Sequence, residues 1–149
     1  MHILDENYDY DPYDFNFISR EFSVEGIIRL FNHKKLNIDE YEWSTRQCSL
    51  FIESILIRIP LKPFYFDNTK GHYKIISGRN RIYALKLIIL DSYQLQGLEF
   101  LTELNNLTFQ QLSRKYQRRI LETCFITHII EAGTPQFLVD NISRRINRS

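Results

Sequence analysis

Residues 73–90, Y-K-I-I-S-G-R-N-R-I-Y-A-L-K-L-I-I-L, decide the fold, because they turn a strand directly into a helix. Residues 73–76 are rich in aromatic and β-branched side chains, which is typical of a strand. After Ser77 and Gly78, apolar residues recur around most of a helix, and a helix of that kind is usually buried. We therefore predict that a core strand meets the first turn of a core helix at Gly78.

The turn at residues 77–81 could bind an anion. The free amides and the dipole at the start of a helix favour negative charge. Gly78 lets the backbone approach a ligand closely, and Arg79 and Arg81 carry charges suited to phosphate or carboxylate. The alternative is a strand–helix corner whose arginines pair with acidic neighbours. Spacing alone favours this alternative, because one glycine and two arginines form a weak motif.

The size of the chain and its cysteines predict one domain in a reducing compartment. A chain of 149 residues can bury about two thirds of its unfolded surface, so its core needs no metal or disulfide. Cys48 and Cys124 both lie in apolar patterns, which is typical of reduced core cysteines. The sequence shows neither a secretory pattern nor an apolar run of about 18 residues. We therefore expect a cytoplasmic protein with no membrane contact.

The charge is unevenly distributed, although the net charge of +1 does not by itself favour nucleic acid. Residues 1–17 alternate acids with aromatic residues and contain no lysine or arginine. We interpret residues 1–22 as an acidic aromatic arm and residues 23–149 as the folded domain. Two interpretations of the arm stay open: a poorly ordered leader, or a segment lying on the basic C-terminal surface.

The remaining patterns predict an α+β fold in which a small mixed or antiparallel sheet packs with helices. Ser23 could cap one helix, and the capping box at residues 44–47 begins a second helix that Pro60 ends. Residues 61–66 and 73–76 form a plausible antiparallel pair. A second capping box at residues 108–111 starts another helix. A strand at 124–130 and a helix after Pro135 complete the chain.

Charged residues on two of these helices have open interpretations. Glu53 is either a functional carboxylate in a cleft or an exposed helical acid, which is the commoner case. Cationic residues of the last two helices could contact DNA, although a solvated face explains such runs more often. These candidates are Arg114, Lys115, Arg118, Arg119, Arg144 and Arg148. The four histidines and two cysteines lack metal-type spacing, so no metal ligands are predicted.

Taken together, these motifs resemble the N-terminal domain of GmrSD-type restriction endonucleases, a bacterial family of the ParB/sulfiredoxin-like superfamily. The likeness covers residues 23–149 in unbroken order. The segments that carry it are Trp43 with residues 49–56 (S-L-F-I-E-S-I-L), 59–66 (I-P-L-K-P-F-Y-F), 73–85, 97–105 (G-L-E-F-L-T-E-L-N), 117–120 (Q-R-R-I), 133–135 (G-T-P) and 145–147 (R-I-N).

The resemblance implies a domain that binds and hydrolyses NTP through a D-G-Q-Q-R type loop and controls DNA cleavage in defence against phage. The nuclease usually lies in a separate HNH-type domain. In this chain Gly78 and Arg81 match the loop, whereas Ser77 replaces its aspartate and Arg79-Asn80 replace its polar pair. The Gln-Arg pair that usually precedes the tryptophan is absent before Trp43.

These departures predict binding without efficient hydrolysis, because serine cannot hold Mg²⁺ or orient water as aspartate can. NTP with Mg²⁺ is the cofactor that the resemblance implies. We predict a nucleotide-binding regulatory module with a degenerate active site. The alternatives are an inactive interaction subunit, acting with a nuclease or a phage protein, and a ParB-like DNA-binding protein. The predicted phosphate-binding residues are Ser77, Gly78, Arg79, Asn80, Arg81, Glu53, Arg145 and Asn147.

Overall fold

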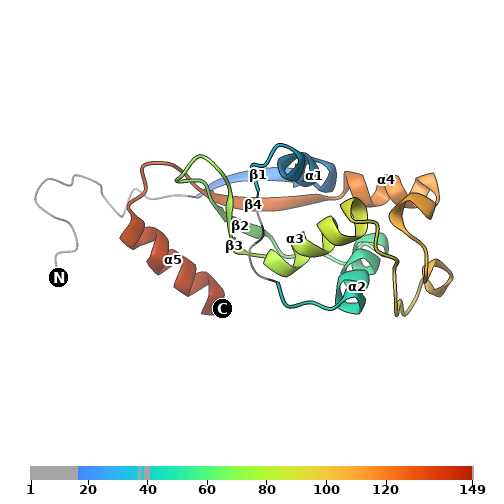
Figure 1. Ribbon diagram of the computed structural model, residues 1–149. Coiled ribbons are helices and arrows are strands. Elements are labelled where there is room, and N and C mark those ends of the chain that lie inside the picture. The colour runs from blue at the N-terminus through green and yellow to red at the C-terminus, as the bar shows by residue number, and fades with distance from the viewer. Residues whose placement is uncertain (1–16, 37, 39–40, 149) are drawn as a thin grey trace, which may run out of the picture.

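The computed structural model describes residues 17–36, 38 and 41–148, and it has the predicted α+β class (Figure 1). A four-stranded sheet is combined with five α-helices in this part of the chain. The strands are β1 (Ile18–Ser23), β2 (Phe64–Asp67), β3 (Lys74–Ser77) and β4 (Cys124–Ile130). The helices are α1 (Val24–Asn32), α2 (Thr45–Leu56), α3 (Arg79–Leu85), α4 (Arg114–Glu122) and α5 (Gln136–Arg148). Shorter helical segments are the π-helix η2 (Lys86–Leu90) and the 3-10 helices η3 (Thr102–Leu104) and η4 (Phe109–Gln111).

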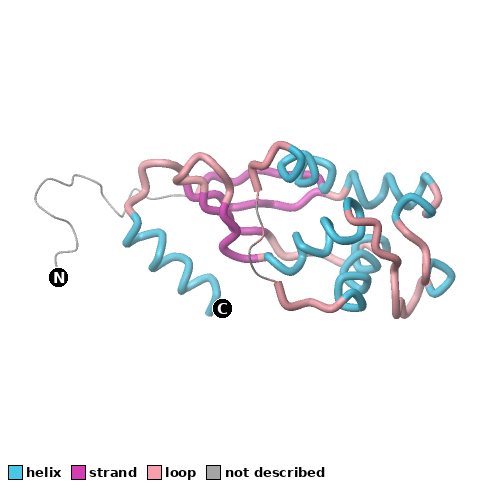
Figure 2. Tube along the Cα trace, viewed as in Figure 1, coloured by secondary structure: helices cyan, strands magenta, loops and turns pink. Residues whose placement is uncertain are grey.

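The sheet is mixed, with the strand order β1-β4-β2-β3 (Figure 2). β2 and β3 form the antiparallel pair that the sequence predicts. β4 lies parallel to β2 and antiparallel to β1, so a strand from late in the chain occupies a central position. The first and last strands of the chain, β1 and β4, are therefore brought together only by the tertiary fold.

The two faces of the sheet bury different clusters, because successive side chains of a strand point to opposite faces. Phe64 and Phe66 of β2 lie in the main core, which α1 to α4 cover, whereas Tyr65 packs in a second, smaller cluster. That second cluster contains Ile76 and Val139, and it receives the apolar side of α5. In Figure 1, α5 accordingly lies apart from the other four helices.

The capping predictions at Ser23 and at residues 44–47 are confirmed, and the one at residues 108–111 is correct for the box but wrong for the helix that it starts. The Ser23 hydroxyl accepts a hydrogen bond from the Gly26 amide at 3.0 Å at the start of α1. Ser44 and Gln47 form the predicted capping box, with Ser44 N–H donating to Gln47 Oε1 at 2.8 Å. The box at Thr108 is also present, but it starts the short helix η4, and α4 has its own cap at Ser113.

Two expectations about the ends of the chain need correction. The folded domain was expected to begin at residue 23, yet Ile18–Ser23 is strand β1 and pairs with β4 over its whole length. Residues 1–16, the rest of the predicted arm, lie outside the described residues. Cys124 was expected in the core but is exposed, whereas Cys48 is buried, and burial raises the pKa of its thiol to about 11.

Candidate functional site

Gly78 occupies the strand–helix corner that the sequence predicts. The space beside its Cα is filled by another residue of the chain. Its φ of +109° lies in the left-handed region that glycine tolerates. A Cβ built at this position would lie 2.4 Å from Cδ1 of Phe64, a core side chain with no exposed surface. The glycine therefore lets the turn approach the protein's own Phe64 ring, which explains it without a ligand.

Two further residues of the corner hold neighbouring backbone in place. Arg81 donates hydrogen bonds to the carbonyl oxygens of Lys62 at 2.6 Å and Pro63 at 3.2 Å. Its guanidinium also lies 4.5 Å from the centre of the Phe64 ring, and burial lowers the pKa of Arg81. The Asn80 side chain accepts hydrogen bonds from the Glu42 amide at 2.7 Å and the Trp43 amide at 3.3 Å. Backbone carbonyls, and not the acidic neighbours that we considered, thus partner Arg81.

Arg79 is the residue of this corner whose side chain remains available to bind a ligand. Its side chain is half-buried and makes no hydrogen bond or ion pair with any other residue that the structure describes. No acidic residue lies in the first turn of α3 to offset its charge. Ser77, the residue in place of the family's aspartate, ends β3 opposite Tyr65.

Glu53 lies in neither of the two settings that the sequence suggested. Its side chain is buried in the interior side of α2, with 3% of the residue exposed. Its carboxylate accepts hydrogen bonds from the backbone amides of Glu99, Phe100 and Leu101 at 2.9–3.1 Å. Burial alone would raise the pKa of Glu53, but these three hydrogen bonds together hold it below its usual value. Glu53 therefore shapes the loop at residues 99–101.

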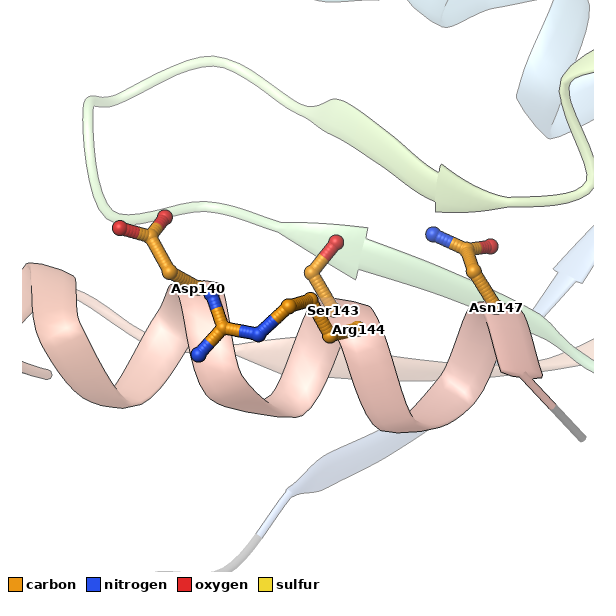
Figure 3. A pocket seen from close by; sticks show the side chains of 4 residues that line it. All are labelled: Asp140, Ser143, Arg144 and Asn147. Carbon is orange, nitrogen blue, oxygen red and sulfur yellow. The ribbon is translucent and has the colours of Figure 1, made fainter.

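The predicted residues of the C-terminal helix lie on exposed parts of α5. Arg145 donates to the Asn141 side chain at 2.7 Å within the same helix. Asn147 lines a shallow pocket of about 490 Å³ with Asp140, Ser143 and Arg144, and Figure 3 shows these side chains along α5. None of the described lining residues comes from the Gly78 corner or from α2. This pocket therefore does not bring Asn147 together with the Gly78 corner or with Glu53.

A basic groove lies along α4, from its first residue to its last. It has a volume of about 430 Å³, and five cationic side chains and one carboxylate line it. We define the basic groove by these residues: Arg58, Arg114, Lys115, Arg118, Arg119 and Glu122. The four α4 cations were predicted as a group, but Arg58 was not.

Arg58 joins the groove because the end of α2 packs against α4. The α2 helix stops at Leu56, earlier than the apolar stripe suggested, and Arg58 takes a left-handed φ of +65°. Arg119 donates to the Leu56 carbonyl at 3.1 Å, which binds the two helices together at this place. No periodicity within the sequence indicates this contact between residues about 60 positions apart.

The positive charge at the start of α4 has no structural compensation. Arg114 and Lys115 occupy the first turn, where the helix dipole already carries partial positive charge and where acids are favoured. The one ion pair of the groove joins Arg118 and Glu122 at 3.3 Å, and both side chains are more than 60% exposed. Exposed pairs of this kind contribute little to stability. Five cations and one carboxylate thus leave the groove with a net positive charge that an external anion would offset.

The described residues define a small α+β domain with a basic groove. Among these residues, no group of three or more histidine, cysteine, aspartate or glutamate side chains could hold a metal ion. Within the same part of the chain, no helix is both long and apolar enough to cross a bilayer. Comparison with models of known families, with curated proteins and with solved structures finds no match.

Proposed function

We propose that this chain is a binding module for nucleic acid and that the basic groove is its contact surface. The observation that carries the proposal is the convergence of five cationic side chains from two elements on one groove. Phosphates of a nucleic acid backbone repeat at short intervals, so a row of cations can engage several at once. The proposal corresponds to the DNA-binding alternative considered from the sequence.

The groove suits phosphate chemically as well as electrostatically. Arginine presents a planar fork of donors that matches phosphate oxygens, and four of the five cations are arginines. The Leu56 carbonyl orients Arg119 with one hydrogen bond, which leaves its other donors for a ligand. Contacts to phosphate groups do not distinguish one base sequence from another. We therefore expect an affinity that depends more on salt concentration than on base sequence.

Removing two groove cations should weaken DNA binding and its dependence on salt. We expect Arg58→Ala/Lys115→Ala to lower the affinity for a short duplex about tenfold or more at low salt, and to reduce the slope of log K against log salt by about 2. The physical reason is that each lost phosphate contact releases one fewer condensed counterion. Fluorescence anisotropy over a series of salt concentrations measures both effects.

The control for charge is Lys70→Ala/Lys74→Ala, which removes the same net charge from exposed positions outside the groove. It should leave the salt slope nearly unchanged. Equal slopes for the two double variants would show that the groove is not the contact surface. Absence of any binding at low salt would exclude the proposal altogether.

The nucleotide-binding function implied by the resemblance to GmrSD-type domains is a second candidate, and the unpartnered Arg79 favours it. A phosphate at the start of α3 would meet this guanidinium and the first helical amides. Binding without efficient hydrolysis is the form that Ser77 suggests. The third alternative, an inactive interaction subunit acting with a nuclease or phage protein, expects neither nucleotide nor DNA to bind.

Alanine variants of Arg79 and Arg81 distinguish nucleotide binding at the Gly78 corner from a purely structural role of that corner. We expect Arg79→Ala to keep the melting temperature of the unliganded chain, and to abolish the stabilisation by ATP, GTP or CTP with Mg²⁺. Arg81→Ala should instead lower the unliganded stability by about 1–3 kcal/mol, because two backbone carbonyls lose their partner. Thermal unfolding with and without each nucleotide gives both results. Stabilisation that survives in Arg79→Ala would contradict nucleotide binding at this corner.

A further inference from the structure

A pocket of about 590 Å³ lies between the end of α1, the segment before α2 and the helix α3–η2. Three tyrosines contribute to its walls: Tyr41, Tyr83 and Tyr93. Its size is within the range of small-molecule sites, and its mixture of apolar and polar walls is also typical of them. No residue of the basic groove or of the Gly78 corner is among its described lining residues.

The π-helix η2 shapes one wall of this tyrosine pocket. Asp91 N–H donates to the Lys86 carbonyl at 3.0 Å, a bond between residues five apart, as a π-turn requires. The side chains of the same two residues form an ion pair at 2.8 Å. In a regular α-helix, residues three or four apart face each other, so this pair depends on the wider turn. π-Turns occur frequently at functional sites, and this one forms part of the pocket wall.

The pocket also exposes apolar surface that the fold leaves uncovered. Tyr41 is 53% exposed, Tyr93 is 50% exposed and Leu90 is 37% exposed, and all three line it. The ring of Tyr41 lies parallel to that of Tyr83, with 3.7 Å between the centroids and 8° between the planes. The Tyr41 ring covers one face of the Tyr83 ring, so the exposed ring of Tyr41 is the surface on which a further planar ring could stack.

From this geometry we propose that the tyrosine pocket binds a neutral, planar heteroaromatic ring of the nucleobase class. Stacking on a tyrosine face explains the exposed rings, since every nucleobase offers a π-face. The polar edge of such a ring carries a donor next to an acceptor, which matches the Asp91 carboxylate and the Lys86 ammonium. Their side chains are 38% and 39% exposed, so both are accessible to a ligand. A neutral ring suits two opposite charges better than an ion does.

Tyr83 completes the site as a neutral phenol. Burial, followed by the hydrogen bond with Tyr41, raises the pKa of Tyr83 to about 12. The phenol therefore keeps its proton at neutral pH and adds no negative charge to the stack. This property supports a ligand that is held by stacking and by hydrogen bonds.

Isothermal titration with adenosine and cytidine tests the proposal on the full chain, with ribose and cyclohexanol as non-aromatic controls. We expect saturable binding of at least one nucleoside and none of either control compound. Tyr41→Ala should weaken that binding about tenfold, because one stacking surface is lost. Asp91→Asn should also weaken it, because the amide replaces one acceptor oxygen with a donor and removes the negative charge that pairs with Lys86. Circular dichroism melting establishes that each variant is folded.

Matched variants distinguish this pocket from other apolar surface and from the basic groove. Phe100→Ala removes an aromatic residue that is 71% exposed and lies outside the pocket, so it should leave nucleoside binding unchanged. Arg58→Ala/Lys115→Ala should also leave it unchanged, since nucleosides carry no phosphate. The proposal is overturned by absence of nucleoside binding, by equal binding of cyclohexanol, or by equal losses in Tyr41→Ala and Phe100→Ala. Sedimentation showing self-association that Tyr41→Ala abolishes would assign the pocket to a second copy and also overturn it.

Discussion

Glu53→Ala is expected to lower the free energy of unfolding by about 3–5 kcal/mol, an effect comparable to breaking a buried charged network. The carboxylate accepts three backbone amides, from Glu99, Phe100 and Leu101, in a setting with 3% exposure. Alanine leaves these three part-buried donors without their protein partner, and a donor that loses its partner is costly where water cannot replace it. It also leaves a cavity beside α2. Urea unfolding at neutral pH measures the loss.

Glu103→Ala is the matched control for this prediction. Glu103 lies in η3, a few residues beyond the loop that Glu53 holds, and its side chain is exposed. Removing it should change the free energy of unfolding by less than about 0.5 kcal/mol. If the two variants were equally stable, the three hydrogen bonds would not be the anchor of this loop.

The contribution of Glu53 should also depend on pH in a definite direction. Its pKa is lower in the folded chain than the ordinary value of 4.5, so the unfolded chain binds the proton more readily. The stabilisation is therefore present above the unfolded pKa, and it is lost as the pH falls through the folded pKa. The stability difference between the native chain and Glu53→Gln should stay constant above about pH 6 and shrink below about pH 4. A difference that grows in acid would contradict the assigned hydrogen bonds.

The second large effect is expected at Gly78, where alanine should lower the free energy of unfolding by about 2–5 kcal/mol. Two penalties add at this position. The φ of +109° is unfavourable for any residue with a Cβ. The new Cβ would also lie 2.4 Å and 2.8 Å from two carbons of the buried Phe64 ring, so the core must shift.

Gly133→Ala separates the two penalties. Gly133 has a similar φ of +95°, but a Cβ there would meet no atom within 4 Å. Its substitution should therefore cost only the backbone strain, about 1–2 kcal/mol. A larger loss for Gly78→Ala in urea unfolding would measure the clash with Phe64. Equal losses would mean that the ring moves aside, and would restore room for a ligand at the corner.

The two candidate sites differ in how far the sequence could predict them. Each of the four α4 cations has another cation four positions away, so helical periodicity alone predicts that they lie near one another. The turn at Gly78 was correctly located, but the partners of Asn80 and Arg81 within the fold were not foreseen. Their partners are backbone groups of residues 42–43 and 62–63, and such groups are present at every position of every sequence. A side chain alone does not reveal which of them it will meet.

The interpretation of Glu53 failed for the same reason. Its position on the apolar side of α2 could have indicated burial, because Ile52 and Leu56 flank it in the stripe. The loop that supplies its three donors lies 46–48 residues further along the chain. Both interpretations that we considered assumed a carboxylate in water or in a cleft, and neither considered backbone amides as the ligand.

By itself the sequence determined the fold class, the capped starts of α1 and α2, and the pairing of β2 with β3. These features depend on side chains within a few residues of one another, whose spacing is visible along the chain. Only the tertiary structure decided the place of β1 beside β4, the addition of Arg58 to the α4 cations, and the tyrosine pocket. Each of these requires contacts between segments far apart in sequence, and such contacts form only when the whole core packs.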